Sequence, residues 1–501
     1  MRNRQISSNP IQEFIHRIFL GEKLNNWVGL LIAVIISTLF AFLLSTNFIL
    51  GLEVFAAIVG ICVLFLCLLS PAAGLYIIML YGFSASALSR FFFKDQLPVG
   101  VVIDILIFTT FIGLFVSNHD LKRNSIRFFK TRPVIWYSII VIYLTFELFN
   151  PLGHSFGGWI QVMRKVFESF LIVFIAYNVF DNLSKIKTFI KFLFFCTFAL
   201  GVYGCFQQWH GLSQTEINWV NADPLRFGLI SIWGEYRKFS LLGGPTEFGI
   251  IMASCSVFFM LIGLNEKNRP SQILYIVGAV FMLLGMSYSG TRTANAMVAG
   301  AIVLFLLLTI NKKASRLFAV FAVLAFLFVM YAPIYSSATL LRVRSTFSAS
   351  EDASYNVREI NRQSVQPFIW KHPFGSGLST TGEMGQKYNP GNPNAGFPTD
   401  SSYLNKALES GWIGMILTCI LYFYMLQYII RGYFFTKNKE FKTLFAASLA
   451  FFFSYFLGEI AQEAVGVFSN MGVYFPVFAL VLRLRQFSGE KTQQFLDNQL
   501  S

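Results

Sequence analysis

Residues 398–430 read PTDSSYLNKALESGWIGMILTCILYFYMLQYII. The first part of this stretch is polar and is typical of a capped helix start. From Gly411 onward the run is apolar and is as long as the roughly 20 residues that a helix needs to cross the bilayer core. The polar part also ends a long polar interval, residues 335–410. The stretch therefore predicts a membrane helix that follows a large polar loop.

The composition of the whole chain extends this prediction. Hydrophobic residues make up 55% and charged residues 13% of the 501 residues, and the mean hydropathy is +0.59, which excludes an ordinary soluble protein. The apolar runs are too long for barrel strands of about ten alternating residues. We therefore predict an all-α, polytopic membrane protein with about fourteen transmembrane helices. The predicted spans are 27–46, 51–69, 71–89, 98–117, 133–150, 167–180, 189–208, 243–264, 271–289, 293–310, 316–334, 411–430, 443–461 and 468–482.

These spans divide the chain into five predicted parts. They are an N-terminal segment (1–26), membrane helices 1–11 (27–334), a loop subdomain (335–410), membrane helices 12–14 (411–482) and a C-terminal tail (483–501). The loop exceeds the usual length of a connection, so it is either functional or disordered. Its aromatic residues and the compact turn at residues 371–377 favour a folded lid.

The placement of basic residues predicts the orientation. With the N-terminus inside, 24 of the 39 Lys and Arg residues fall in the cytoplasmic segments, as the positive-inside rule requires. Both termini are therefore predicted to be cytoplasmic and the loop extracytoplasmic. The net charge of +14 then reflects topology and affinity for anionic lipid, so no nucleic-acid partner is predicted. The N-terminal segment lacks a signal-peptide cleavage site; it is either a short surface helix or a solvated tail.

The positions of the cysteines and acidic residues limit the kinds of functional site that the sequence predicts. All six cysteines fall inside predicted spans, and their spacing predicts neither a disulfide in the outer loops nor a metal site. We therefore expect no metal and no cofactor. Carboxylates such as Glu247, Glu459 and Glu463 lie in the outer half of their spans, whereas a proton-coupled transporter would place them near the midplane. They are either structural ion pairs or part of a site at the outer interface.

Two short outer segments carry arginines that suit a phosphate. Arg237 precedes Gly243 and Gly244 at the start of the eighth span, where free backbone N–H groups favour an anion. A simple helix start is the alternative there. Arg292 follows the turn Ser289-Gly290-Thr291, and its planar guanidinium can form two parallel bonds to a phosphate. The alternative for Arg292 is a side chain that extends to the membrane interface.

Taken in order, these segments resemble the bacterial O-antigen polymerase and O-antigen ligase superfamily. The resemblance covers residues 235–430 well and the flanking spans only by count and hydropathy. Its motifs in the loop are Arg362, the turn His372–Gly377, the stretch 399–404 and the stretch 409–414. It implies a metal-independent, inverting glycosyltransferase that uses a glycan linked to undecaprenyl diphosphate at the outer face of the bacterial cytoplasmic membrane.

The resemblance also implies roles for individual residues. Arg237 and Arg292 would hold the donor diphosphate and neutralise the leaving group, and Arg362 would assist them or organise the loop. Asp400 either accepts the proton of an acceptor hydroxyl, orients that hydroxyl, or caps a helix. Residues predicted to bind substrate are Arg362, Glu247, Gly243, Gly244, His372 and Tyr403.

One departure from the family pattern bears on the activity. Ligases of the family carry a histidine before the helix start of the loop, where this chain has Asp400, and His372 does not align with that histidine. This favours a polysaccharide polymerase over the alternative, a ligase that transfers glycan to lipid A core. A flippase for lipid-linked sugars is the alternative of another class; it would show an internal repeat and charges across the membrane. The predicted partners are the lipid-linked oligosaccharide, membrane lipid and a chain-length regulator.

Overall fold

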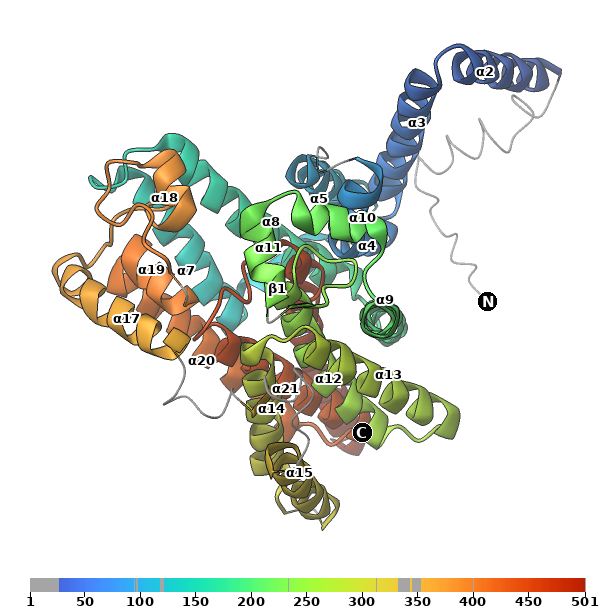
Figure 1. The fold of residues 1–501 in the computed structure, drawn as a ribbon. Coiled ribbons are helices and arrows are strands. Elements are labelled where there is room, and N and C mark those ends of the chain that lie inside the picture. Colours follow the sequence, from blue (N-terminus) through green and yellow to red (C-terminus); the bar gives the residue numbers. More distant parts are fainter. Residues whose placement is uncertain are drawn as a thin grey trace. The chain divides into compact units, whose positions relative to one another are not determined.

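The computed structural model describes residues 27–93, 95, 98–117, 121–232, 234–311, 313–331, 343–344, 353–399 and 401–500. In these residues the chain is almost entirely helical, with one two-stranded antiparallel sheet (Figure 1). The predicted N-terminal segment 1–26, the start of the predicted loop and Asp400 lie outside the described residues.

The elements follow one another along the chain as helices with short connections. They are α2 (Trp27–Thr46), α3 (Phe48–Leu69), α4 (Pro71–Phe92), α5 (Val99–Ser117), α6 (Leu121–Phe129), α7 (Arg132–Phe146), η2 (Glu147–Phe149), α8 (Phe156–Val179), α9 (Leu183–His210), α10 (Gln214–Asn221), α11 (Pro224–Ile230), β1 (Ser231–Ile232), β2 (Glu235–Tyr236), α12 (Pro245–Asn265), α13 (Arg269–Tyr288), α14 (Arg292–Thr309), α15 (Lys313–Tyr331), α17 (Ala353–Lys371), α18 (Gly382–Tyr388), α19 (Ser402–Glu409), α20 (Gly411–Phe435), α21 (Lys439–Gly458), η4 (Phe468–Gly472) and α22 (Tyr474–Leu500).

Every predicted span overlaps a helix of the structure. Among the described residues, nine helices are long and apolar enough to cross a membrane, and further apolar helices are shorter. The prediction of an all-α, polytopic membrane protein is therefore confirmed. The division of the chain into five parts stays a prediction.

Two of the predicted spans have the wrong limits. The span predicted at 167–180 is the second half of α8, which already begins at Phe156. Hydropathy did not predict the first half because it is less apolar and contains Arg164. Nε of Arg164 lies 3.4 Å from Oε1 of Glu168, one helical turn later. The span predicted at 468–482 is not one helix, because residues 468–472 form the 3-10 helix η4 before α22 begins.

The residues of η4 explain why that span is broken. The amide of Asn470 accepts a hydrogen bond from the hydroxyl of Tyr455 at 2.8 Å and donates one to the carbonyl of Ala464. The backbone N–H of Ser469 also has a partner outside a regular α-helix, because it donates to the carboxylate of Glu247 at 3.0 Å. The break places a short polar element among apolar helices, where backbone is tolerated only with such partners.

The described chain forms two compact units. Among the described residues, those between 27 and 78 and between 100 and 125 form the first, and those between 79 and 99 and between 126 and 500 form the second. In the first unit, α2 and α3 pack as a hairpin, with the rings of Phe40 and Phe55 5.7 Å apart. The buried face of α5 includes Ile103, Leu106 and Ile107.

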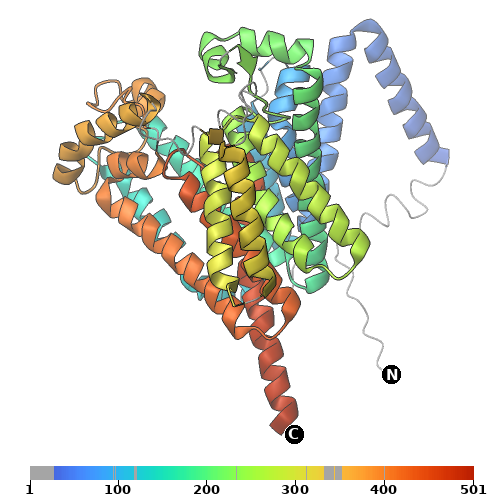
Figure 2. The same ribbon diagram turned by 60° about the horizontal axis from the view of Figure 1, so that its bottom comes forward.

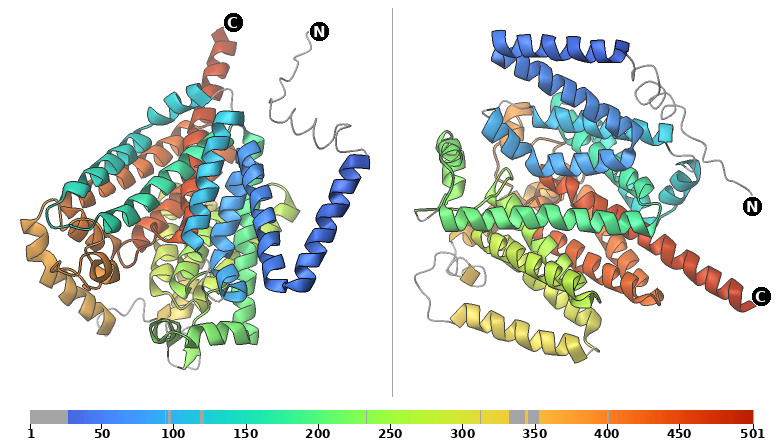
Figure 3. Two further views of the ribbon diagram at one scale, coloured as in Figure 1. Left: turned by 90° about the horizontal axis from the view of Figure 1, so that it is seen from above. Right: turned by 90° about the vertical axis from the view of Figure 1, so that its right-hand side faces the viewer.

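Helix α12 lies at the centre of the second unit. In its most apolar stretch, 83% of the residues are buried, and the helix packs against α9, α13, α14 and α21 (Figures 1 and 3). Small residues such as Gly249, Ala253 and Ser254 are buried along it, which allows close approach of the neighbouring helices. The N-terminal end of α12 is thereby held in a fixed position, and this end belongs to the candidate site.

Residues 353–399 and 401–409 fold into the helices α17, α18 and α19. These helices lie together beside the N-terminal end of α20, and the C-terminal end of α20 lies far from them (Figure 2). The turn at Ser376 and Gly377 is joined to the end of α19: Ser376 N donates to the carbonyl of Leu408 at 2.8 Å, and Gly377 N donates to that of Glu409 at 2.9 Å. In these residues the loop has a defined backbone, as its turn sequence predicted.

Gly375 offers a test of this packing. Its φ is +70°, and a Cβ there would lie 2.5 Å from the carbonyl oxygen of Glu409. We expect Gly375→Ala to destabilise the fold by more than about 2 kcal/mol, because a left-handed backbone costs a residue with a side chain roughly 1–2 kcal/mol before the clash is added. The thermal unfolding midpoint in detergent measures this. Gly391→Ala is the matched control, since nothing lies within 4 Å of a Cβ at Gly391; equal midpoints for the two variants would contradict the expectation.

Candidate functional site

The side chain of Arg237 joins two segments that are about fifty residues apart in the sequence. Its Nε donates to the carbonyl of Ser289 at 2.8 Å, and its Nη2 donates to the hydroxyl of Thr291 at 3.0 Å. Its Nη1 donates to the carbonyl of Leu229 at 3.1 Å. The guanidinium is half-buried and therefore fixed beside the turn that precedes Arg292.

The same turn contacts the start of α12. The hydroxyl of Thr291 donates to the carbonyl of Pro245 at 3.0 Å. A Cβ at Gly249 would lie 2.8 Å from the side chain of Thr291, so glycine is needed for this close approach. The structure thus brings the start of α12 and the start of α14 together.

Glu247 completes this group of residues. Its Oε2 accepts a hydrogen bond from Gly243 N at 3.1 Å, and its Oε1 accepts one from Ser469 N at 3.0 Å. Both of its oxygens are therefore occupied by backbone donors. We call the group formed by residues Arg237, Gly243, Gly244, Glu247, Ser289, Thr291 and Arg292 the cradle.

The electrostatics of the cradle favour an anion. Gly244 and Thr291 are the N-caps of α12 and α14, and neither helix start has a side-chain cap hydrogen bond. Unsatisfied N–H groups and the helix dipole make such a start attractive to negative charge. Arg237, Arg292 and the two helix starts contribute positive charge to the cradle, and Glu247 in the first turn of α12 contributes its one carboxylate.

A second group of contacts surrounds Glu459, whose side chain is completely buried. Its Oε2 lies 2.6 Å from Nζ of Lys406 and accepts a hydrogen bond from the hydroxyl of Tyr422 at 3.3 Å. Its Oε1 accepts from the backbone N–H groups of Ala464 and Val465, each at 2.8 Å. We call Glu459 with these partners the Glu459 hub.

The loop helices are attached to the hub. Ser402 N donates to the carbonyl of Glu459 at 3.0 Å, and the hydroxyl of Tyr403 donates to the carbonyl of Phe456 at 3.2 Å. Arg362, from α17, donates through Nη2 to the carbonyl of Ile460 at 3.4 Å. Two predicted substrate-binding residues, Arg362 and Tyr403, therefore lie at the hub, and their described bonds attach the loop to α21 and its C-terminal end.

The cradle and the hub are linked by one segment of the chain. Residues 459–472 carry Glu459 at one end, and at the other end Ser469 donates to Glu247. Within this segment, the amide of Asn470 donates to the carbonyl of Ala464 and accepts a hydrogen bond from the hydroxyl of Tyr455 in α21. Residues 459–472 therefore connect the hub to the cradle through the chain itself and these hydrogen bonds.

The remaining predicted residues have other positions. His372 lies at the end of α17, where Nδ1 is 2.9 Å from the carbonyl of Phe368 and its ring stacks on that of Phe368 with centroids 4.1 Å apart; its described contacts do not reach the cradle. Asp400 lies outside the described residues. The helix cap that was one alternative for Asp400 is provided by Ser401, whose hydroxyl accepts from Leu404 N.

Several residues of these groups were not predicted. Ser469 and Lys406 carry no motif, and Glu459 was predicted only as a carboxylate near the outer interface. Arg90 donates to the carbonyls of Ser240 and Leu242, which fixes the backbone just before Gly243. An arginine at the end of an apolar span is a signal that calls for a partner, but it does not say which one.

Glu409, at the end of α19, has an unusual environment. Its Oε1 accepts hydrogen bonds from the hydroxyl and the N–H of Thr381, at 2.8 and 3.3 Å. Burial nevertheless raises the pKa of Glu409 to about 7, and the hydrogen bonds from Thr381 reduce this effect only in part. The carboxyl group is therefore partly protonated near neutral pH.

This raised pKa predicts a pH dependence of stability. Between pH about 4.5 and about 7 the folded state holds a proton that the unfolded state has lost, so stability falls as pH rises through this window and levels off above it. The whole change is of the order of 3 kcal/mol. We expect Glu409→Gln, which does not titrate, to lose this part of the pH dependence. Thermal unfolding of both proteins at the two ends of the window measures it; parallel curves would contradict the expectation.

In the part of the chain that the structure describes, no three His, Cys, Asp or Glu side chains gather in a way that would hold a metal ion. Among curated proteins, none matches the sequence. One family model does match: residues 277–419 fit Wzy_C, described as O-antigen ligase. The matched segment is similar to this family and covers less than half of the chain. The resemblance to the O-antigen polymerase and ligase superfamily is therefore confirmed, and the polymerase branch is not distinguished.

The matched segment, residues 277–419, covers part of the site described above. It begins within α13, includes Arg292, the loop helices and Tyr403, and ends within α20. Arg237 and Glu247 lie before it, and Arg237 reaches it through its hydrogen bonds to Ser289 and Thr291. With its many apolar helices, the chain is a multi-pass membrane protein, and its similarity to the Wzy_C family supports a glycosyl-transferring enzyme of the O-antigen ligase or polymerase type.

Proposed function

We propose that the protein is a polysaccharide polymerase. It transfers a growing glycan from its undecaprenyl-diphosphate carrier to the next lipid-linked repeat unit. The reaction takes place at the outer face of the bacterial cytoplasmic membrane, with both termini in the cytoplasm. The loop helices then cover the outer end of α20.

The observation that carries this proposal is the cradle. A diphosphate leaving group gains negative charge as the glycosidic bond breaks, and fixed cations aimed at that charge are a large catalytic contribution. Arg237 is held by three hydrogen bonds before any substrate arrives, and it lies beside the residue that precedes Arg292. This prior fixation supports a role in stabilising the leaving diphosphate.

The proposed reaction is a single displacement without a metal ion. The acceptor hydroxyl oxygen attacks the anomeric carbon of the donor from the face opposite to the diphosphate, and the bond to the diphosphate oxygen breaks. The configuration is inverted, and undecaprenyl diphosphate departs with the bonding electrons. The hydroxyl proton passes to Asp400, which directly precedes the N-cap Ser401 of α19.

The loop would bind the acceptor in this proposal. Tyr403 and Arg362 are attached to the Glu459 hub, and the segment 459–472 leads from there to Glu247 in the cradle. Binding of a lipid-linked repeat unit under the loop can thus be coupled to the donor site. His372, which follows the last residue of α17, stays a predicted substrate-binding residue in this proposal.

A ligase is the second candidate, and the description of the Wzy_C family favours it. Such an enzyme would transfer the finished glycan to lipid A core with the same donor chemistry. The two candidates therefore share the cradle and differ in the acceptor. Asp400 in place of the family's histidine supports the polymerase.

A genetic experiment separates these candidates. Wild type, Arg292→Ala and the control Arg269→Ala, an exposed arginine at the other end of α13, are expressed in a strain that lacks its own copy. Their membrane levels are equalised, and the surface glycan is separated on a gel. A ladder with wild type and Arg269→Ala, but single units on lipid A core with Arg292→Ala, would support a polymerase.

Three other results would contradict parts of the proposal. Accumulation of long lipid-linked polymer with Arg292→Ala would mean a ligase. A normal ladder with Arg292→Ala would remove the role given to this arginine. Loss of the ladder with both variants would show that the change does not depend on the cradle.

A further inference from the structure

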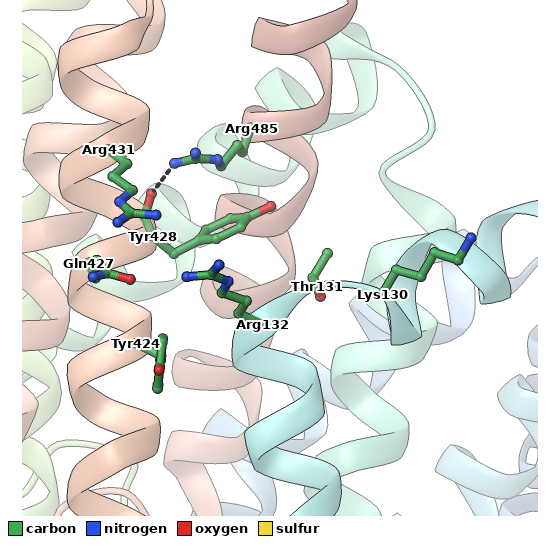
Figure 4. A pocket seen from close by; sticks show the side chains of 8 residues that line it. All are labelled: Lys130, Thr131, Arg132, Tyr424, Gln427, Tyr428, Arg431 and Arg485. Atoms are coloured by element: carbon green, nitrogen blue, oxygen red, sulfur yellow. Dashed lines mark hydrogen bonds between the residues drawn. The ribbon is translucent and has the colours of Figure 1, made fainter.

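A pocket lies between α7, α20 and α22, near the start of α7 and the C-terminal end of α20 (Figure 4). Its volume is about 280 Å³. The residues that line it are Lys130, Thr131, Arg132, Tyr424, Gln427, Tyr428, Arg431 and Arg485. Along α20, this lining begins 13 residues after Gly411, so it is about 20–30 Å away from the loop end of the helix.

Four of the eight lining residues are basic and none is acidic. Among the side chains that the structure describes, which end at residue 489 in α22, no carboxylate lies within ion-pair distance of Lys130, Arg132, Arg431 or Arg485. The pKa of Arg485 is lowered, chiefly by burial and further by the neighbouring Arg431, although Tyr428 acts in the opposite sense. Arg485 is therefore a partly buried cation that repels its neighbour Arg431, while Lys130, Arg132 and Arg431 are exposed at the pocket.

The walls of the pocket hold these groups in place. Nη1 of Arg485 donates to the carbonyl of Tyr428 at 2.8 Å, and its guanidinium lies 4.7 Å from the centre of the Tyr428 ring. The ring of Tyr424 stacks on that of Trp136, with centroids 5.5 Å apart. Figure 4 shows the guanidinium groups of Arg132, Arg431 and Arg485 around the ring of Tyr428.

The start of α7 adds to the positive potential. This helix has 15 residues, and its N-cap Thr131 forms no cap hydrogen bond, because the hydroxyl donates to the carbonyl of Phe128 at 2.7 Å instead. The positive end of the helix dipole is therefore next to Arg132. An anion in the pocket would relieve the repulsion among the cations and accept hydrogen bonds from several of them at once.

We propose that this pocket binds the phosphate group of an anionic phospholipid. The pocket lies near the ends of helices α7 and α20, both of which can span a membrane, so a lipid head group can enter from the side. Its volume is slightly below the roughly 300–1,000 Å³ of pockets that enclose a whole drug-sized ligand, which suits a head group with its chains outside. Basic pockets between membrane helices on the cytoplasmic side bind such head groups, and the orientation proposed above places this pocket there.

This inference does not depend on the proposed polymerase activity. It can be tested with the purified full-length protein in a neutral detergent. The ligands are dihexanoyl phosphatidylglycerol, dihexanoyl phosphatidylcholine and inorganic phosphate, and binding is measured by calorimetry. The variant is Arg431→Gln, which changes an exposed side chain and is expected to fold. Lys439→Gln is the control, because Lys439 is an exposed cation just after α20 that does not line the pocket.

We expect phosphatidylglycerol to bind to wild type and to Lys439→Gln, and to bind about tenfold more weakly to Arg431→Gln, because one charge-assisted bond pair is lost. Phosphatidylcholine should bind much more weakly than phosphatidylglycerol. If inorganic phosphate binds as tightly as phosphatidylglycerol and depends equally on Arg431, the phosphate site is real but the lipid assignment is wrong. Equal binding to wild type and Arg431→Gln, or equal weakening by Lys439→Gln, would overturn the proposal.

Discussion

Arg237→Ala is expected to lower kcat/KM for glycan transfer by about 10²–10³-fold, the usual effect of removing one preorganised donor to a developing anion. We expect this loss because the guanidinium of Arg237, which bonds Ser289 and Thr291, is held beside the turn that precedes Arg292. Arg237→Lys keeps the charge but cannot form the paired bonds. We therefore expect it to recover only part of the activity. Transfer from a synthetic lipid-linked donor to a lipid-linked acceptor measures both variants.

Arg226→Ala provides the control for this prediction. Arg226 lies in the same connection between α9 and α12, pairs with Asp95 at 3.1 Å and stacks on Trp219 at 4.0 Å. It thus has as many local bonds as Arg237 but does not contact the cradle. We expect less than a tenfold effect. A similar loss in Arg226→Ala and Arg237→Ala would mean that the activity responds to the folding of this connection and not to the cradle.

The largest effect on stability is expected at the Glu459 hub. Glu459→Gln keeps the size of the side chain but removes the charge that Lys406 faces at 2.6 Å. Since Glu459 is fully buried, breaking this pair should cost about 3–5 kcal/mol. The change is read from the thermal unfolding midpoint in detergent. Cleavage of residues 353–409 by trypsin should also become faster, because the loop helices are attached to this hub.

Glu440→Gln is the matched control. Glu440 also pairs with a lysine, Lys187, at 2.7 Å, but both side chains are about half exposed. Water and salt screen such a pair, so its loss should cost about 0–1 kcal/mol. Comparable shifts of the unfolding midpoint in the two variants would show that burial of Glu459 does not strengthen its pair.

Much of the fold could be predicted because the signal for a membrane helix lies within one segment. Each predicted span overlapped a helix, since about 20 apolar residues suffice to identify it. The errors came where this signal is weakest: α8 begins with charged and small residues, and η4 interrupts an apolar run with Ser469 and Asn470. In η4 the backbone N–H of Ser469 donates to Glu247 of α12, and hydropathy along one segment contains no information about such a partner.

The candidate site was predictable only in part. Arg237, Arg292 and the glycine-containing turns beside them predicted a site for an anion. The structure joins Arg237 to the turn before Arg292, a contact that neither motif predicted. The ion pair of Lys406 with Glu459 could not be predicted from the sequence, because the two residues are more than fifty positions apart and share no motif. The cap at Ser401 in place of Asp400 depended on a shift of one residue, which helix-start rules do not resolve.

The most direct test of the proposed function uses the purified protein in liposomes that contain only undecaprenyl-diphosphate-linked repeat units. We predict that the glycan lengthens by whole repeat units and that one undecaprenyl diphosphate is released for each unit added. Transfer that occurs only after lipid A core is supplied, or movement of the repeat units across the bilayer without a new glycosidic bond, would contradict the account.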